Sequence, residues 1–306
     1  MMIEPVNTNY DKPLIGIVVL QFNQSEETIK CLEPIKNILY SNHIIIVVDN
    51  ASDTKHFKNI EYWIANSKSE KFILIDNKNN LGYGGGNNIG IKRALEMGAD
   101  YVFILNNDCI VEPNILDNLL NSCVNKNADI AQACIIENNK IIKAGEINWL
   151  SPNGSHITDM ESNLEFIDYP FYAIGAALFV SKNILMKNIF FDEKYFLYFE
   201  DADFSFTARS AGFKIISAMD SIVRHGGGAS TNALGINKMY YTFRNMLFFN
   251  HKYAPFYVRI IIPFWIFYFK IKQRIKILFG IDSEKSQLIL QAINDYGKQI
   301  TGIKIQ

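Results

Sequence analysis

Apolar runs alternate with amphipathic stretches over the first third of the chain. The apolar runs are rich in β-branched residues and predict four buried strands, at 14–22, 43–50, 71–77 and 100–108. Apolar residues at helical spacing predict helices at 25–35 and 87–99. Strands that alternate with helices build a largely parallel sheet covered on both faces. The pattern therefore predicts an α/β fold.

Each of these predicted strands runs into a polar tip. The tips are Phe22-Asn23, Asp49-Asn50, Asp76-Asn77 and Asn106-Asn107-Asp108. Ligands of open α/β sheets bind at the carboxyl ends of the strands, so we expect the tips to converge on one crevice. Ordinary Asn and Asp turn chemistry is the alternative explanation for any one of them.

Residues 111–230 follow a less regular pattern, without internal repeats. Helices are predicted at 112–124 and 199–212, and short strands at 131–136, 141–150 and 214–219. The stretch 172–185 reads as a buried strand that runs into the start of a helix.

Composition narrows the class of protein. The chain has 306 residues, of which 49% are hydrophobic, so it can bury a large core and is not disordered. A net charge of -1 gives no general attraction to nucleic acid. Cys31, Cys109, Cys123 and Cys134 lack the spacing of a zinc site or a disulfide framework. The N-terminus lacks the features of a signal peptide, so we expect a cytoplasmic protein in which the sequons at Asn23, Asn50 and Asn153 are chance matches.

The composition changes near the C-terminus. No acidic residue occurs between Asp220 and Asp282, and eight Lys or Arg accompany many aromatics from Lys238 to Gly280. The apolar stretch 253–270 is shorter than the ~20 residues of a spanning helix. Two interpretations remain. In one, this segment lies on an anionic membrane surface. In the other, it forms a helix pair that packs on the domain and exposes its basic face to solvent. The aromatic residues of this region could also form a homodimer interface.

A glycine-rich stretch, NNLGYGGGNN (79–88), follows the third predicted strand. Glycines let backbone amides approach a pyrophosphate, and a helix N-terminus favours its charge. Asn87 interrupts the GxGxxG pattern, and a dinucleotide fold would place its glycines after the first strand. The stretch disfavours NAD or FAD and leaves a nucleotide diphosphate as ligand.

Three further segments carry candidate chemistry. Asp108, beside the amides of Asn106 and Asn107, can hold Mg²⁺ or Mn²⁺, and His225 in RHGGGAS can add a nitrogen ligand. The acidic cluster Glu200-Asp201-Ala202-Asp203 follows a run of aromatics, where a carboxylate can act as a general base. A capped turn, a satisfied histidine and acids that favour a helix dipole are the structural alternatives.

Seven segments together resemble glycosyltransferase family 2. They are VVLQFN (18–23), VVDNAS (47–52), NNLGYGGGNNIG (79–90), ILNND (104–108), GAALFV (175–180), FLYFEDADFSFTARSAGF (196–213) and RHGGGAS (224–230). The order is that of the family, most similar to bacterial rhamnosyltransferase-like enzymes of capsule, O-antigen or cell-wall synthesis, and the match covers about 13–250.

The resemblance implies a GT-A fold, a Rossmann-like mixed sheet flanked by helices, with a C-terminal helical extension. We expect a catalytic domain at 13–230, with a nucleotide-sugar half (13–110) and an acceptor half (111–230). A basic and aromatic extension follows at 231–306.

The resemblance also assigns roles to residues. Nucleotide-sugar contacts fall on Phe22, Asp49, Asn50, Asn80, Gly82, Gly84, Asn87, Asn107, Gly175 and Ala176. Asp49 would accept a hydrogen bond from a pyrimidine N3–H. Asp201 would be the catalytic base and Glu200 would orient hydroxyls, while Arg244 would meet an acceptor phosphate. Asp108 and His225 would hold the metal, chiefly Asp108, since Asn106 replaces the first acid of the DxD motif.

The activity so implied is inverting sugar transfer from a nucleotide diphosphate to a hydroxyl of a glycan or polyprenyl-linked acceptor. It would use Mg²⁺ or Mn²⁺ at the inner face of the plasma membrane. The resemblance favours dTDP-rhamnose, with UDP-hexoses and UDP-galactofuranose open. A catalytically silent nucleotide-binding or scaffold subunit is the alternative. A sugar nucleotidyltransferase is disfavoured, because QFNQSEET (21–28) contains neither Gly nor Arg or Lys.

Overall fold

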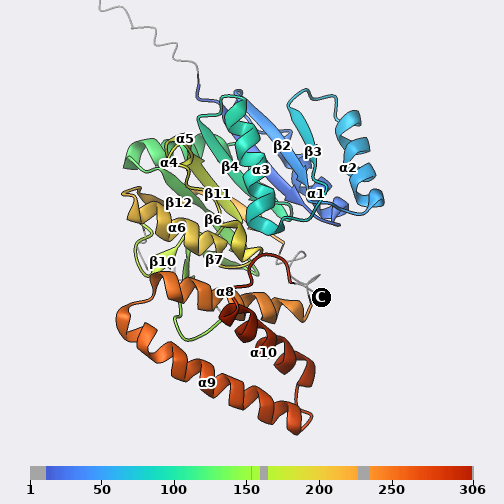
Figure 1. Ribbon diagram of the computed structural model, residues 1–306. Helices are drawn as coiled ribbons and strands as arrows, with labels where there is room; N and C mark the ends of the chain where they lie inside the picture. Colours follow the sequence, from blue (N-terminus) through green and yellow to red (C-terminus); the bar gives the residue numbers. More distant parts are fainter. Residues whose placement is uncertain (1–11, 153, 159–164, 227–234, 305–306) are drawn as a thin grey trace, which may run out of the picture.

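The computed structural model describes residues 12–152, 154–158, 165–226 and 235–304. A central sheet in the order β3-β2-β1-β4-β11-β6-β12-β5 carries helices on both faces (Figure 1). The four strands predicted first are present, as β1 (Ile15–Gln21), β2 (His43–Asp49), β3 (Phe72–Asp76) and β4 (Tyr101–Asn106). They pair in parallel. The predicted α/β fold is confirmed.

The other half of the sheet is mixed. Its strands are β5 (Cys109–Val111), β6 (Ile130–Glu137), β7 (Lys140–Ile142), β11 (Ala177–Ser181) and β12 (Ile215–His225). β11 is antiparallel to both β4 and β6, and β12 is parallel to β6 but antiparallel to β5. A second sheet joins β8 (Ala144–Glu146), β9 (Ser155–Ile157) and β10 (Phe171–Tyr172). The predicted strand at 141–150 is therefore divided, because β7 pairs with β6 while β8 joins the second sheet.

Helices cover the two faces of the central sheet according to the alternation of its side chains. They are α1 (Ser25–Ile35), α2 (Thr54–Asn66), α3 (Gly82–Glu96), α4 (Ile115–Lys126), α5 (Lys182–Leu185) and α6 (Glu200–Ser210), with a 3₁₀ turn, η1 (Glu193–Tyr195). Ile15, Ile17 and Val19 face the core formed with α1, α2 and α4. Val18 faces the core formed with α3, α5 and α6. Successive strand residues point to opposite faces, so one strand serves both cores.

Two helices differ from the prediction. The sequence analysis did not identify α2, although Phe57, Ile60 and Ile64 recur at helical spacing. α3 begins at Gly82 rather than at residue 87. Gly90 lets this helix lie close to β1, since a Cβ there would come within 2.4 Å of Val18 Cγ1.

The C-terminal segment contains α8 (Asn237–Tyr253), α9 (Phe256–Leu278) and α10 (Ser283–Gly297). α8 packs on α10 through a core that includes Tyr240, Leu247, Ile289 and Ile293. Figure 1 shows α9 at the end of the molecule farthest from β1–β3. Within the described ranges, no helix combines the length and apolarity needed to cross a bilayer. The N-terminal stretch 1–11, the sequon at Asn153 and residues 227–230 of RHGGGAS lie outside the described residues.

Candidate active site

A cavity of about 840 Å³ opens at the carboxyl ends of the central strands. The strand tips that line it are Phe22, Asn50, Asn106 and Asn107. Asp76, at the end of β3, is instead exposed and pairs with Lys78, because β3 lies at the edge of the sheet. Three of the four predicted tips thus meet at one crevice, and the tip of β3 does not.

Asn50 ties β2 to the glycine-rich loop. Its Nδ2 donates to Asn80 Oδ1 (2.9 Å) and to Gly82 O (3.0 Å), and its Oδ1 accepts from Leu81 N (3.1 Å). Gly82 has a φ of +74°, and a Cβ there would lie 2.2 Å from Phe196 O. Only glycine fits, so the loop is held against the segment before α6. Asn80 and Gly82 line the cavity beside Asn50.

Three other residues expected to contact the nucleotide lie behind the cavity wall. The Asp49 carboxylate is 1% exposed, and it accepts hydrogen bonds from the Gln21 side chain and from Ser52 N. Gly84 and Asn87 are buried within α3. None of the three lines the cavity. The contact between Asp49 and a pyrimidine therefore stays a prediction, and this carboxylate shapes the turn after β2.

Glu200 and Asp201 begin α6 and line the same cavity as the strand tips. Asp201 Oδ2 accepts from Gly175 N (3.1 Å), and its Oδ1 accepts from Ala202 N (2.8 Å). Glu200 is 5% exposed, and its Oε2 has no hydrogen-bond partner among the described residues. Gly175 and Ala176 line the cavity on the same side. The two carboxylates share a site but have different surroundings.

These surroundings separate the two pKa values. Burial raises the pKa of Glu200 well above its usual value of 4.5, and the neighbouring Asp201 raises it further. Burial also raises the pKa of Asp201, but its backbone hydrogen bonds from Gly175 and Ala202 oppose this. The proton shared by the pair therefore resides on Glu200, which leaves Asp201 as the ionised carboxylate.

Glu200→Gln is expected to stabilise the fold at pH 8 by on the order of 1 kcal/mol, because an amide buries no charge. The carboxyl of the unfolded chain loses its proton near pH 4.5, whereas the folded one holds it to higher pH. The wild-type fold therefore loses stability as the pH rises from there through the raised pKa. Urea unfolding of both proteins between pH 4 and pH 8 measures the difference. If the difference in unfolding free energy between the wild type and Glu200→Gln did not change with pH, this prediction would be contradicted.

Asp203, the third acid of the cluster, is structural. The Asp203 side chain is buried. It accepts a hydrogen bond from Tyr195 OH (2.8 Å) and forms an ion pair with Lys252 (2.9 Å). Arg209, six residues further along the same helix, donates to the carbonyls of Ile167 and Phe171. Asp203 thus joins α6 to η1 and α8 rather than to the cavity.

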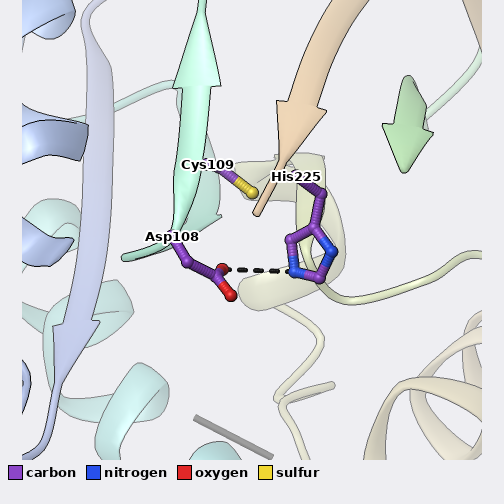
Figure 2. A group of neighbouring side chains, drawn as sticks. All are labelled: Asp108, Cys109 and His225. Carbon is purple, nitrogen blue, oxygen red and sulfur yellow. Dashed lines mark ion pairs between the residues drawn. The ribbon is translucent and has the colours of Figure 1, made fainter. Parts of the chain in front are cut away.

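Asp108 and His225 come together through the pairing of β5 with β12, in which His225 lies opposite Cys109. Asp108 Oδ1 is 3.2 Å from His225 Nε2 (Figure 2). Glu137 Oε2 is 3.7 Å from His225 Nδ1. Burial lowers the pKa of His225, but the two carboxylates outweigh it and raise the value overall. His225 and Glu137 line the cavity. The segments around 108 and 225 are therefore adjacent in space.

This cluster fits a hard divalent cation. The ligand atoms of Asp108, Cys109 and His225 lie within 4.8 Å of one another. Carboxylate oxygens and an imidazole suit Mn²⁺, and carboxylates suit Mg²⁺. Nearby, the Oδ1 of Asn106 is buried without a hydrogen-bond partner in the described part of the chain, as a carbonyl beside a ligand would be. Burial raises the pKa of the Cys109 thiol, which donates to Ala176 O and so stays protonated.

We expect Asp108→Asn and His225→Ala each to weaken Mn²⁺ binding by about tenfold or more, since each removes a ligand. Cys109→Ala should leave Mn²⁺ affinity within about twofold, because a protonated thiol is no ligand. The free-ion EPR signal of Mn²⁺ measures all three variants. Loss of affinity in Cys109→Ala, with the fold intact by circular dichroism, would place the thiol in the site.

Arg244 corrects an expectation. The side chain is 0% exposed, so it offers no surface to an acceptor phosphate. Its guanidinium donates to Gly302 O (2.7 Å) and Tyr195 O (3.1 Å), and its Nε donates to Asn245 Oδ1 (3.0 Å). Arg244 thus connects α8 with η1 and with the tail that follows α10. The sequence showed the basic residue but not its burial.

The sequence analysis did not name several polar residues that line the cavity. Among them are Tyr83, Glu137, Tyr198 and Lys238. Tyr83 donates to Gly175 O (2.8 Å), and its pKa is raised by burial and by the charges of Glu200, Asp201 and Asp108. Tyr83 therefore lies near both the carboxylate pair and Asp108. Its place inside the glycine-rich loop was the available signal.

Comparison with known proteins agrees with this geometry. Residues 16–184 match the model of the family described as Glycosyl transferase family 2. A curated relative, the low-salt glycan biosynthesis hexosyltransferase Agl10 of Haloferax volcanii, is 24% identical over 211 residues. The alignment covers 66% of this chain and 63% of the relative, so the chain spans less than two thirds of that protein.

Two solved structures share the fold. The mannosyltransferase PcManGT of Pyrobaculum calidifontis, in complex with GDP-Man and Mn²⁺, has a TM-score of 0.56 at 13% identity, over 77% of this chain and 64% of that one. TarS 1–349 of S. aureus, in complex with UDP-GlcNAc, has a TM-score of 0.56 at 13% identity, over 94% and 81%. The predicted GT-A architecture, with helices at the C-terminus, is confirmed.

Proposed function

Because the chain belongs to glycosyl transferase family 2, we propose that it transfers a sugar from a nucleotide diphosphate to a hydroxyl group of an acceptor, with inversion at the anomeric carbon. The observation that carries this proposal is one cavity lined by both Asp201 and His225. His225 in turn contacts Asp108. A base and a cation site that share one cavity are what an in-line displacement needs.

Asp201 is the base in this mechanism. Its carboxylate takes the proton of the acceptor hydroxyl as the oxygen attacks the anomeric carbon. The bond between that carbon and the diphosphate oxygen breaks on the opposite side, so the configuration inverts and the nucleoside diphosphate leaves. Glu200, protonated beside Asp201, donates a hydrogen bond to a sugar or acceptor hydroxyl.

Asp108 and His225, with Glu137 nearby, would hold Mg²⁺ or Mn²⁺, which supplies charge to neutralise the leaving diphosphate. Asn80 and Gly82 border the nucleotide at the cavity wall. Gly175 and Ala176 border the sugar on the wall that also carries the base. Phe22 and Asn107 line the cavity at the strand tips. There they would border the nucleobase and the ribose of the donor.

Our choice of donor rests on the resemblance to rhamnosyltransferase-like enzymes and not on the residues that line the cavity. dTDP-rhamnose is our leading donor, and a bacterial surface polysaccharide is the leading product. The related structures bind GDP-Man and UDP-GlcNAc, which keeps other nucleotides open. The domain division at residue 230 likewise remains part of the proposal.

A thermal-shift panel with dTDP, UDP and GDP, each with and without Mn²⁺, tests the proposal. A ligand at about 100 times its dissociation constant adds roughly 2.7 kcal/mol to the apparent stability of the fold. We expect one diphosphate to stabilise more than the others, and only with Mn²⁺. Release of nucleoside diphosphate from the corresponding donor should then depend on acceptor. No stabilisation by any of the three would contradict the proposal, and stabilisation without turnover would favour the silent subunit.

A further inference from the structure

The outer face of α9 carries a stripe of large apolar side chains. Its principal members, between 42% and 80% exposed, are Phe256, Ile260, Phe264, Phe267, Ile271 and Leu278. A helix turns about 100° per residue, which places these six within an arc of about 80°. They form a straight stripe about 33 Å long. Apolar patches of this size on a monomer mark an interaction surface.

The opposite face of α9 is anchored to the protein. Val258 and Ile262 pack in the core shared with α8 and α10, and Gln273 Oε1 accepts from Ser286 Oγ (3.0 Å). The contacts of α9 with the rest of the protein are therefore made by its inner face, and the stripe on the outer face is left exposed. Figure 1 shows that α9 lies farther from the central sheet than α8 does.

Charge indicates what covers the stripe. Lys270 and Arg274 lie along one side of it and Lys272 along the other, by the helical rotation. No acidic residue occurs from 221 to 281. A second copy of this face would bring these cations against like charges. Anionic lipid headgroups complement them, while the acyl region accepts the apolar stripe.

We propose that the outer face of α9 binds the surface of a membrane that contains anionic lipid, with the helix axis parallel to the bilayer. The anchored inner face prevents α9 from crossing the bilayer, and Pro263 interrupts its apolar run. Each basic residue near such a surface strengthens binding several-fold. Three of them beside a long apolar stripe give reversible peripheral binding.

This orientation brings the cavity close to the lipid. A smaller hollow of about 360 Å³ is lined by Tyr257 and Val258 of α9 and by residues 146–150. Glu146, Ile147 and Asn148 line this hollow and the large cavity alike. A lipid-borne acceptor would enter by this side. That step rests on the proposed function, whereas the binding of α9 to lipid does not.

Flotation with vesicles tests the binding. Vesicles of phosphatidylcholine with about 30% phosphatidylglycerol should bind the wild-type protein about tenfold better than phosphatidylcholine alone, and about 0.5 M salt should reduce binding. Phe264→Gln with Phe267→Gln, and separately Lys270→Gln with Arg274→Gln, should each weaken binding by about tenfold. Met186→Gln, a change at an exposed apolar residue outside α9, is the matched control and should bind like the wild type.

Two outcomes would overturn the proposal. One is wild-type protein that does not float with anionic vesicles, or a Phe264/Phe267 variant that binds as well as wild type. The other is a stable dimer in sedimentation equilibrium that the same variant dissociates, since a second copy would then cover the stripe. Vesicle flotation needs no sugar donor or acceptor. A failure of the lipid-binding proposal can therefore be distinguished from a failure of the transferase proposal.

Discussion

Asp201→Asn is expected to lower turnover by about 10² to 10⁴ while nucleotide affinity stays within about twofold. The amide cannot take the acceptor proton, and Asn80 and Gly82, which we propose to border the nucleotide, are unchanged in this variant. Donor turnover and calorimetric binding of the nucleoside diphosphate measure the two effects. Full turnover in this variant would remove Asp201 from the role of base.

Asp203→Asn is the matched control for that experiment. Its carboxylate contacts Tyr195 and Lys252 outside the cavity, so the change should lower stability and leave the turnover of folded protein near that of wild type.

The pH profile of turnover gives a second check on the role of Asp201. A base acts when deprotonated, and burial raises the pKa of Asp201 above 3.8, so turnover should fall with decreasing pH at a midpoint above that value.

Arg244→Met is expected to reduce the free energy of unfolding by about 3 kcal/mol or more. The substitution leaves the carbonyl of Gly302 without its donor, removes one of the donors to the carbonyl of Tyr195, and removes the contact with Asn245. Urea denaturation measures the loss. Arg93→Met, at an exposed ion pair on α3, is the control and should change stability by about 0.5 kcal/mol or less.

The same variant also tests the discarded role of Arg244. If Arg244→Met kept wild-type stability but raised the KM for acceptor alone, the side chain would contact the acceptor after all. We expect the reverse pattern, because a side chain with no exposed surface acts through the fold.

Local pattern was sufficient for much of the fold. The apolar runs placed β1 to β4, whereas α3 was predicted to begin at residue 87 and begins at Gly82. The helix α2 was readable from Phe57, Ile60 and Ile64 but was not identified. The division of 141–150 into β7 and β8 was not readable, because it depends on which neighbour each half pairs with.

The sequence by itself determined the family, the alternation of strands and helices, and the residue types that carry the chemistry, since these depend on short-range periodicity and ordered motifs. Tertiary structure alone decided which of those residues meet. The β5–β12 pairing joined Asp108 to His225, packing buried Arg244 and Asp203, and the anchoring of one face of α9 left the other apolar face in solvent. Burial and strand pairing arise from contacts between distant segments, which no local window of sequence contains.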